Sequence, residues 1–299
     1  MKYRVSHTSK YIYSESVSRC HNEVRMTPLN NRNQSVEKTK TKIFPMPQKT
    51  FERIDYFGNK VIGFDIHREH KKLTVTVISE VQTLPPAKPS AEFEKMPWNQ
   101  VRDMMHSSSN SLDILAKEYL LASPLVPLED EIQTYAALSF PEGRPIFEAL
   151  QDLTKRIYKD FKYEPGFTTI STPLAELMQH RKGVCQDFAH LEIACVRSMN
   201  LPAAYVSGYL ETDPPPGKVK LVGSDASHAW LTVYIPGFGW QDLDPTNNQQ
   251  PNERYVTVAV GRDYADVTPL KGVIYGGGAH KLEVKVDVAP MAMAHQEGA

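Results

Sequence analysis

The first third of the chain alternates between apolar and polar residues with a period of two. The clearest run extends from Leu73 to Val81, where every second residue except Ser79 is Leu or Val. This alternation, with its many β-branched and aromatic residues, predicts half-buried strands. Gly58-Asn59 lies between two apolar pairs and predicts the turn of a β-hairpin. We therefore expect a β-sandwich or barrel over residues 1–83.

The pattern changes after a proline-rich stretch. Residues 84–90, Leu-Pro-Pro-Ala-Lys-Pro-Ser, fit neither a strand nor a helix, so we expect a linker over residues 84–98. Beyond Pro145, apolar residues fall near helical spacing. The clearest helix is predicted after Gly183 and ends at Asn200-Leu201-Pro202. Its apolar residues follow at steps of four, three, four and four, and they are Val184, Phe188, Leu191, Cys195 and Met199.

A second hairpin is predicted further along the chain. His228–Ile235 is a strand of high β-propensity, and Trp240–Asp244 returns after the turn Pro-Gly-Phe-Gly. A symmetric four-residue loop would place His228 and Asp244 on opposite faces of the hairpin. A loop of three or five residues instead places Asp244 opposite Trp230, diagonal to His228 and on the same face. We therefore expect His228 and Asp244 to be neighbours.

The length of 299 residues is compatible with two domains, because a single core rarely grows much past ~250–300 residues. We expect an N-terminal β domain at residues 1–83 and a mixed core at residues 99–299, which gives an α+β fold. The chain has 34 Lys and Arg residues against 35 Asp and Glu residues. The resulting net charge of −1 provides no general attraction for nucleic acid or for acidic membranes.

The distribution of apolar residues also bears on location. No apolar stretch approaches the ~18 residues of a membrane span, and the first ten residues lack the apolar segment of a secretory signal. We therefore expect a cytoplasmic protein with no membrane partner. The three cysteines are too few, and odd in number, for a disulfide scaffold.

Cys185 lies in the first turn of the helix predicted after Gly183. The helix dipole and the free N–H groups there favour the thiolate, which is the nucleophilic form of cysteine. The alternative is that Cys185 is a small buried apolar residue, as many free cysteines are. We expect no metal, because Cys185 and His190 lie about 140° apart around the helix axis. We expect no cofactor either, because Gly276-Gly-Gly278 lacks the strand–helix context of a phosphate-binding loop.

Several short segments carry a family resemblance. They are Gly183–His190, Gly208-Tyr209, His228–Trp230 and Asp244–Thr246, followed by Gly261–Asp266 and Gly276–Gly278. Together with the order Cys185, His228 and Asp244, they resemble the transglutaminase-like superfamily of papain-type cysteine enzymes. The N-terminal strands are similar to the β-sandwich-like domain that precedes the core in the bacterial branch. The resemblance implies a papain/transglutaminase-like core with a helical part and an antiparallel sheet.

The resemblance also implies a catalytic triad. Cys185 would attack as a thiolate paired with the imidazolium of His228, which then protonates the leaving amine. Asp244 would fix the imidazole tautomer and support its charge. The backbone N–H of Cys185 is one expected donor to the oxyanion, and Gln179 is a candidate for the second donor.

Four further residues of this region have alternative interpretations. Asp242 competes with Asp244 because the two share one face of an ideal strand, but the motif and the distance from His228 argue against it. Asp187, in the first helical turn, is expected to cap the helix. His190 is expected to be a packed or surface residue. Cys195 is expected to be inert in the core.

The expected function is that of a cysteine hydrolase that cuts peptide or other amide bonds through an acyl-enzyme thioester, with a peptide or protein as substrate. The chemically adjacent alternative is a transglutaminase-type acyltransferase, in which an amine rather than water resolves the thioester. No calcium-loop pattern or additional β domain follows the core, which favours hydrolysis. A non-catalytic binding module on the same fold is the third possibility. It is disfavoured because all three triad positions are present.

Overall fold

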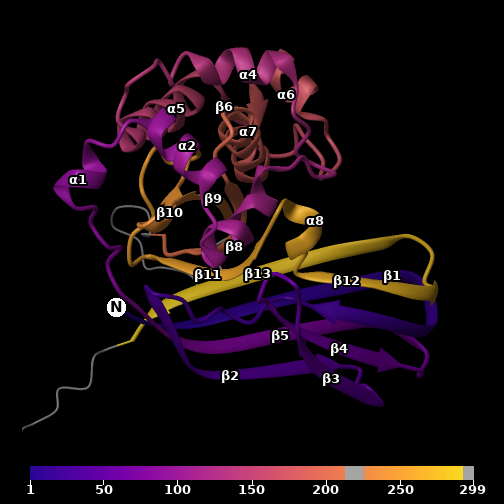
Figure 1. Cartoon of the computed structure of the whole chain (residues 1–299). Coiled ribbons are helices and arrows are strands. Elements are labelled where there is room, and N and C mark those ends of the chain that lie inside the picture. The colour runs from indigo at the N-terminus through magenta and orange to yellow at the C-terminus, as the bar shows by residue number, and fades with distance from the viewer. Residues whose placement is uncertain (213–224, 226, 292–299) are drawn as a thin grey trace, which may run out of the picture.

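The computed structural model describes residues 1–212, 225 and 227–291. Its two larger sheets organise the chain into two parts (Figure 1). One part is a long antiparallel sheet of seven strands, and the other is a four-stranded antiparallel sheet covered by helices. The fold is therefore α+β, with a β-rich N-terminal region and a mixed core, as the sequence predicts.

The long sheet is built around β1 (Lys2–Val24), which has partners on both edges. Tyr3 pairs with β5 on one edge and with β13 on the other, and Cys20 pairs with β4 and β12 in the same way. The strands β4 and β5 thus form one row and β12 and β13 another, while β2 and β3 form an outer row. These strands are β2 (Gln34–Phe44), β3 (Lys49–Ile54), β4 (Lys60–Ile66), β5 (His70–Thr83), β12 (Leu270–Gly276) and β13 (His280–Pro290).

A run of glycines forms the bend between β12 and β13. Gly276, Gly277 and Gly278 have positive φ angles of 87°, 92° and 60°. The N–H group of Gly277 donates to the carbonyl oxygen of Ser16 at 3.1 Å, and a Cβ atom at position 276 would lie 2.6 Å from that oxygen. Glycine is therefore required at this bend. The strands form one curled sheet rather than the two separate sheets of a sandwich.

The C-terminal strands require a correction to the expected domain division. The sequence pattern assigned residues 99–299 to one core, but β12 and β13 pair with β1 and complete the N-terminal sheet. The alternation of Leu282, Val284, Val286 and Val288 is a sign of a strand. It cannot identify the partner strand, because the pairing joins segments that are far apart in the sequence.

The core sheet has the strand order β10-β9-β8-β11, and helix α7 (Cys185–Ser198) packs against β8 and β9. Most of the helices lie on the side of this sheet away from the long sheet (Figure 1). Among the described residues, no helix is both long and apolar enough to cross a membrane. The other elements are α1 (Ala91–Glu94), α2 (Trp98–Ser107), α3 (Ser111–Ala116), the 3-10 helix η1 (Lys117–Leu120), α4 (Asp130–Ala137), α5 (Ile146–Asp160), β6 (Lys162–Tyr163), α6 (Leu174–His180), β7 (Lys182–Gly183), β8 (Ala203–Leu210), β9 (Ser227–Ile235), β10 (Gly239–Leu243), β11 (Tyr255–Gly261) and α8 (Tyr264–Val267).

The two parts share a hydrophobic core. Tyr3 and Val288 of the long sheet are buried in the same cluster as Leu191 of α7. A buried hydrogen bond of 2.8 Å between His7 Nδ1 and the hydroxyl group of Tyr209 also joins the two sheets. The long sheet is therefore a structural support of the core and not a loosely tethered module.

Candidate active site

Cys185 is the first residue of α7, as the sequence pattern predicts. The carboxylate of Asp187 accepts a hydrogen bond from the backbone N–H of Val184 at 2.8 Å and another from the hydroxyl group of Thr168 at 2.6 Å. The predicted capping role of Asp187 is confirmed. A Cβ atom on Gly183 would lie 2.8 Å from Asp187 Oδ2, so this cap requires glycine there. The helix start thus holds Cys185 in a fixed place with its side chain partly exposed.

The hairpin of β9 and β10 has the predicted register. Gly239 pairs with Ile235, which leaves a loop of three residues, and Leu243 pairs with Leu231. Asp244 therefore follows β10 at the position opposite Trp230 and on the face of His228, and the predicted parity is confirmed. His228 Nε2 lies 2.7 Å from Asp244 Oδ2.

The carboxylate of Asp244 is fully buried and has many hydrogen-bond donors. The hydroxyl group of Tyr255 and the side-chain amide of Asn247 each donate to Oδ2 at 2.7 Å, and the backbone N–H of Thr246 donates to Oδ1 at 2.9 Å. Burial raises the pKa of Asp244, but the bonds from His228, Tyr255 and Asn247 outweigh burial, so the pKa is lowered. Asp244 is therefore an ionised carboxylate at neutral pH.

The imidazole of His228 interacts with both other members of the predicted triad. Burial lowers the pKa of His228, but hydrogen bonds and charge interactions with Asp244 and Cys185 outweigh burial and raise it to about 10. The ring is therefore an imidazolium at neutral pH. Because Nε2 is bonded to Asp244, Nδ1 is the nitrogen available to the thiol. The structure thus brings Cys185, His228 and Asp244 together at one site.

Two family descriptions match separate parts of the chain. The bacterial transglutaminase-like N-terminal region matches residues 3–82, and the transglutaminase-like superfamily matches residues 136–245, which contain Cys185, His228 and Asp244. The chain belongs to the transglutaminase-like superfamily.

Relatives of this transglutaminase-like protein include two mycobacterial proteins that match it over nearly its whole length. An uncharacterized protein of Mycobacterium tuberculosis H37Rv is 42% identical over 296 residues, which are 97% of this chain and 93% of the relative. An uncharacterized protein of Mycobacterium leprae is 33% identical over 292 residues, which are 97% of this chain and 99% of the relative.

Two further proteins that resemble this chain have names that refer to an activity. A protein-glutamine gamma-glutamyltransferase of Pseudomonas aeruginosa is 29% identical over 139 residues, which are 42% of this chain and 21% of that enzyme. The crystal structure of a candidate cysteine protease from Cytophaga hutchinsonii has a TM-score of 0.74 at 22% identity, and the match covers 98% of this chain and 92% of that one. This second likeness shows a shared fold across both parts of the chain.

The packing around His228 explains why this transglutaminase-like chain has a glycine at position 208. The ring of Trp230 is stacked beside that of His228, with centroids 6.1 Å apart and an interplanar angle of 29°. A Cβ atom on Gly208 would lie 2.4 Å from the ring of Trp230 and 2.2 Å from the carbonyl oxygen of Val256. Gly208 therefore leaves space for the indole that supports the histidine.

Sequence reasoning missed three residues of the transglutaminase-like site. Asn247 and Tyr255 donate hydrogen bonds to Asp244. The third is Tyr163, whose pKa is raised by burial and by its neighbour Cys185. Strand β6 places Tyr163 beside Gly183, two residues before Cys185. A single tyrosine or asparagine does not belong to a repeating sequence pattern that would mark it, although Asn247 lies only three residues after Asp244. Gln179, a candidate for the second oxyanion donor, lies exposed on α6.

The remaining candidate residues lie outside the Cys185–His228–Asp244 site. His190 is buried and its Nε2 accepts the backbone N–H of Tyr264 at 3.1 Å, while burial lowers the pKa of His190 to about 4. Cys195 is fully buried. Asp242 pairs with Thr232 within the hairpin, one step further from His228 than Asp244. No group of three or more His, Cys, Asp or Glu residues in the described ranges could hold a metal ion.

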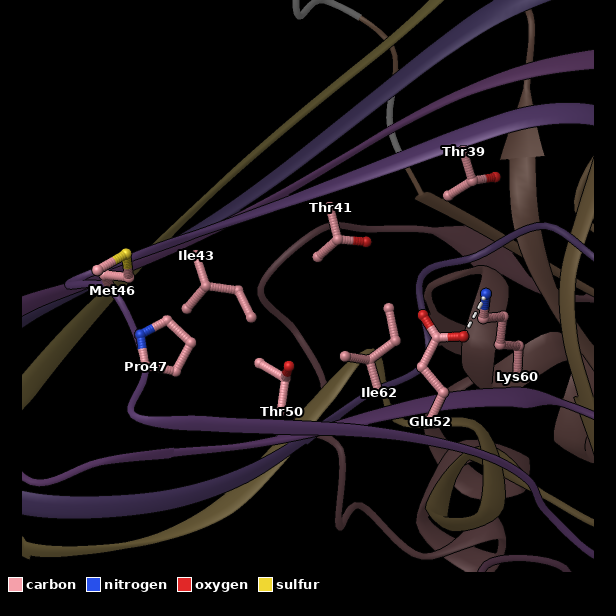
Figure 2. A pocket seen from close by; sticks show the side chains of 9 residues that line it. All are labelled: Thr39, Thr41, Ile43, Met46, Pro47, Thr50, Glu52, Lys60 and Ile62. Carbon is pink, nitrogen blue, oxygen red and sulfur yellow. Dashed lines mark ion pairs between the residues drawn. The ribbon is translucent and has the colours of Figure 1, made fainter.

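A hollow of about 390 Å³ in the long sheet is a different kind of surface (Figure 2). Its lining comes from β2, β3, the segment between them and β4, and it consists mainly of Thr, Ile, Met and Pro residues. Glu52 and Lys60 form an ion pair of 2.8 Å at one end. None of the described lining residues is a Cys or a His, so this hollow offers no nucleophile and base pair comparable to the site on α7.

Proposed function

We propose that the protein is a cysteine enzyme that cleaves amide bonds in a peptide or protein substrate. The observation that carries the proposal is the pair formed by His228 and the ionised Asp244, placed beside a partly exposed cysteine at a helix start. A thiolate and an imidazolium held together form the reactive couple of nucleophilic catalysis by cysteine. The membership of the transglutaminase-like superfamily supports the same reading.

In the acylation step, the Sγ atom of Cys185 attacks the carbonyl carbon of the amide and forms a C–S bond. The oxyanion that develops accepts a hydrogen bond from the backbone N–H of Cys185, and the hydroxyl group of Tyr163 is a candidate second donor in addition to Gln179. The C–N bond then breaks, and His228 transfers its proton to the leaving amine. A thioester on Cys185 and a neutral imidazole remain.

In the deacylation step, water attacks the thioester carbon while His228 accepts a proton from it. The C–S bond breaks, a carboxylic acid leaves, and the thiolate–imidazolium pair is restored. Asp244 stays ionised throughout and acts through His228 by holding the orientation of the ring. An amine that replaced water in this step would give the transglutaminase outcome. The glutamyltransferase relative supports that second candidate for the part of the chain that it matches.

The first experiment labels the folded protein with iodoacetamide and locates the modified cysteine by mass spectrometry. We expect Cys185 to react and the buried Cys20 and Cys195 to react slowly. A peptide library is then incubated with and without a dansylated primary amine, so that cleavage and amine incorporation are read in one assay. Cys185→Ala should abolish both, and Cys195→Ala is the matched control. Faster labelling of Cys195 than of Cys185 would contradict the proposal.

A further inference from the structure

An aromatic pocket lies on the outer face of the core sheet, bordered by α3 and by the loop between β1 and β2. Its volume is about 730 Å³, within the range of roughly 300–1,000 Å³ that is usual for ligand sites. Phe57, Tyr119, Trp240 and Tyr234 form a continuous wall. The ring centroids of Tyr119 and Tyr234 each lie 5.2 Å from that of Trp240, and that of Phe57 lies 6.3 Å from that of Tyr119.

This aromatic pocket is separate from the site at Cys185. Thr232 and Tyr234 line it from β9, and along that strand Trp230 stands between them and His228. The alternate residues Leu231 and Val233 point to the other face, where they belong to the core cluster that contains α7. A ligand in the aromatic pocket would therefore meet a different set of side chains from an acyl substrate on Cys185.

The floor of the pocket contains polar groups with unused hydrogen-bonding capacity. Thr232 is only 5% exposed, and within the described part of the chain its hydroxyl group has no hydrogen-bond partner of normal geometry. The carboxyl group of Asp242 lies opposite Thr232 and also lines the pocket. Burial raises the pKa of Asp242, and the neighbouring Thr232, Arg32 and Trp230 offset this effect only in part. This half-buried carboxyl group, whose ionised form is only partly compensated, would gain from a cationic donor.

The charged groups around the pocket also favour a cation. Asp113, which is 7% exposed, is a second carboxyl group of the lining and accepts a hydrogen bond from Tyr234 at 2.7 Å. Arg32 is the one cation among the described lining residues. Its guanidinium donates to the carbonyl oxygens of Phe238 and Trp240 and lies 5.3 Å from the ring of Phe238. Two carboxyl groups thus face one guanidinium that is already bonded to the main chain.

We propose that the aromatic pocket binds an organic cation, namely an amine with an apolar body. Its ammonium group would donate to Asp242 and Thr232, and the faces of the surrounding rings would attract its charge. Leu112 and Leu115 of α3, each 64% exposed, line the pocket and extend its apolar surface toward solvent. They provide contact area for an aromatic or alkyl body. A carboxylate ligand would meet two like charges, and a neutral one would add no positive charge to the partial compensation that Arg32 gives Asp242.

The test compares three probes of similar shape by isothermal titration calorimetry at about pH 8: 2-phenylethylamine, 2-phenylethanol and 3-phenylpropionate. We expect the amine to bind at least roughly tenfold more tightly than the alcohol, since a hydrogen bond to a charged group contributes about 1.5–3 kcal/mol. The carboxylate should not bind. Fluorescence should report the same event, because Trp240 is part of the wall.

Variants locate the binding event. Asp242→Asn should weaken amine binding roughly tenfold or more and leave alcohol binding unchanged, and Thr232→Val should have a smaller effect in the same direction. Asp103→Asn, a change of an exposed acid on α2, is the control. Cys185→Ala should retain amine binding, which separates this site from an amine acceptor at the catalytic cysteine. Failure of the catalytic proposal would leave these results unchanged.

Three results would overturn the proposal. The first is equal affinity for the amine and the alcohol, and the second is unchanged amine binding in Asp242→Asn that folds with wild-type circular dichroism and Tm. The third is that 2-phenylethylamine does not bind.

Discussion

Asp242 and Asp244 lie two residues apart on the same face of one hairpin, yet their surroundings give them opposite properties. Burial raises the pKa of both carboxyl groups. At Asp244, hydrogen bonds from His228, Tyr255 and Asn247 outweigh burial, and the pKa is lowered. At Asp242, the neighbouring donors do not outweigh burial, and the pKa is raised.

The difference shows that the supply of donors, and not removal from solvent alone, decides the direction in which the pKa of a carboxyl group shifts. Asp244, directly after β10, is surrounded by donors and lies beside an imidazolium. Asp242, within β10, faces the aromatic pocket, and its neighbours compensate burial only in part. One arm of the hairpin therefore supplies the orienting acid of the proposed catalytic site and the acid of a proposed binding site.

Replacement of Asp244 should have the largest effect on turnover. Asn keeps the shape of the side chain but cannot support the imidazolium, so we expect kcat/KM to fall by roughly 10³–10⁴-fold, as in the analogous change in serine triads. The measurement uses the best peptide from the library, with Asp103→Asn as the control. A loss smaller than about tenfold would mean that Asp244 is not the residue that orients His228.

Turnover should decline only at strongly alkaline pH. Burial lowers the pKa of His228, but the interactions with Asp244 and Cys185 have a larger effect in the opposite direction and raise the pKa to about 10. The imidazolium that protonates the leaving amine is lost as the pH rises through this value. The logarithm of kcat/KM, measured between pH 6 and 10.5, should therefore stay level until it falls near pH 10. A decline that begins near pH 6.5 would contradict a strong interaction with Asp244.

His228 and His190 should change the unfolding free energy in opposite directions as the pH rises. The folded pKa of His228, about 10, lies above the ordinary 6.5, so its stabilisation is complete below pH 6.5 and is lost as the pH rises toward 10. Burial lowers the pKa of His190 to about 4, so its stabilisation is present above pH 6.5 and is lost as the pH falls toward 4.

Urea unfolding of His228→Gln and His190→Gln, each compared with the wild type, tests this difference. The loss of unfolding free energy in His228→Gln should shrink between pH 6.5 and 10, whereas that in His190→Gln should shrink below pH 6.5. If the loss of unfolding free energy changed with pH in the same direction for both variants, the surroundings of the two rings would not differ as described.

The smallest expected effects are on the unfolding free energy, and they should differ between the surroundings of Asp244 and those of Asp242. Tyr255→Phe removes one donor to the ionised Asp244 and should cost about 1.5–3 kcal/mol of unfolding free energy. Asp242→Asn removes a half-buried acid whose charged form is disfavoured, and should change that free energy by less than about 1 kcal/mol. Urea denaturation at pH 7 measures both. A larger cost for Asp242→Asn would show that its carboxyl group has partners that stabilise it.

Much of the site could be predicted because its determinants are local. The start of α7 at Cys185 follows from apolar spacing, and the parity of His228 and Asp244 follows from the length of one hairpin loop. The roles of Tyr163 and Tyr255 could not be predicted in this way. Each reaches the site through the packing of separate elements, and one aromatic residue has no periodic pattern to mark it.

The fold was harder to predict where pairing is non-local. The alternation in the first third of the chain indicates strands, but not that β1 pairs with β12 and β13. The glycines at 276–278 gave no sign of their partner, because the bend that they form is defined by the carbonyl oxygen of Ser16. Local patterns reveal elements, and only the assembled structure reveals which elements meet.

The pairing of β1 with the C-terminal row has a consequence for biosynthesis. The first strand leaves the ribosome early, but one of its edges has no partner until Leu270–Pro290 has been made. At roughly 5–20 residues per second, this edge stays open for on the order of 10–50 seconds. An unpaired strand edge is prone to associate with other chains, so the nascent protein should depend on chaperones until the last strands arrive.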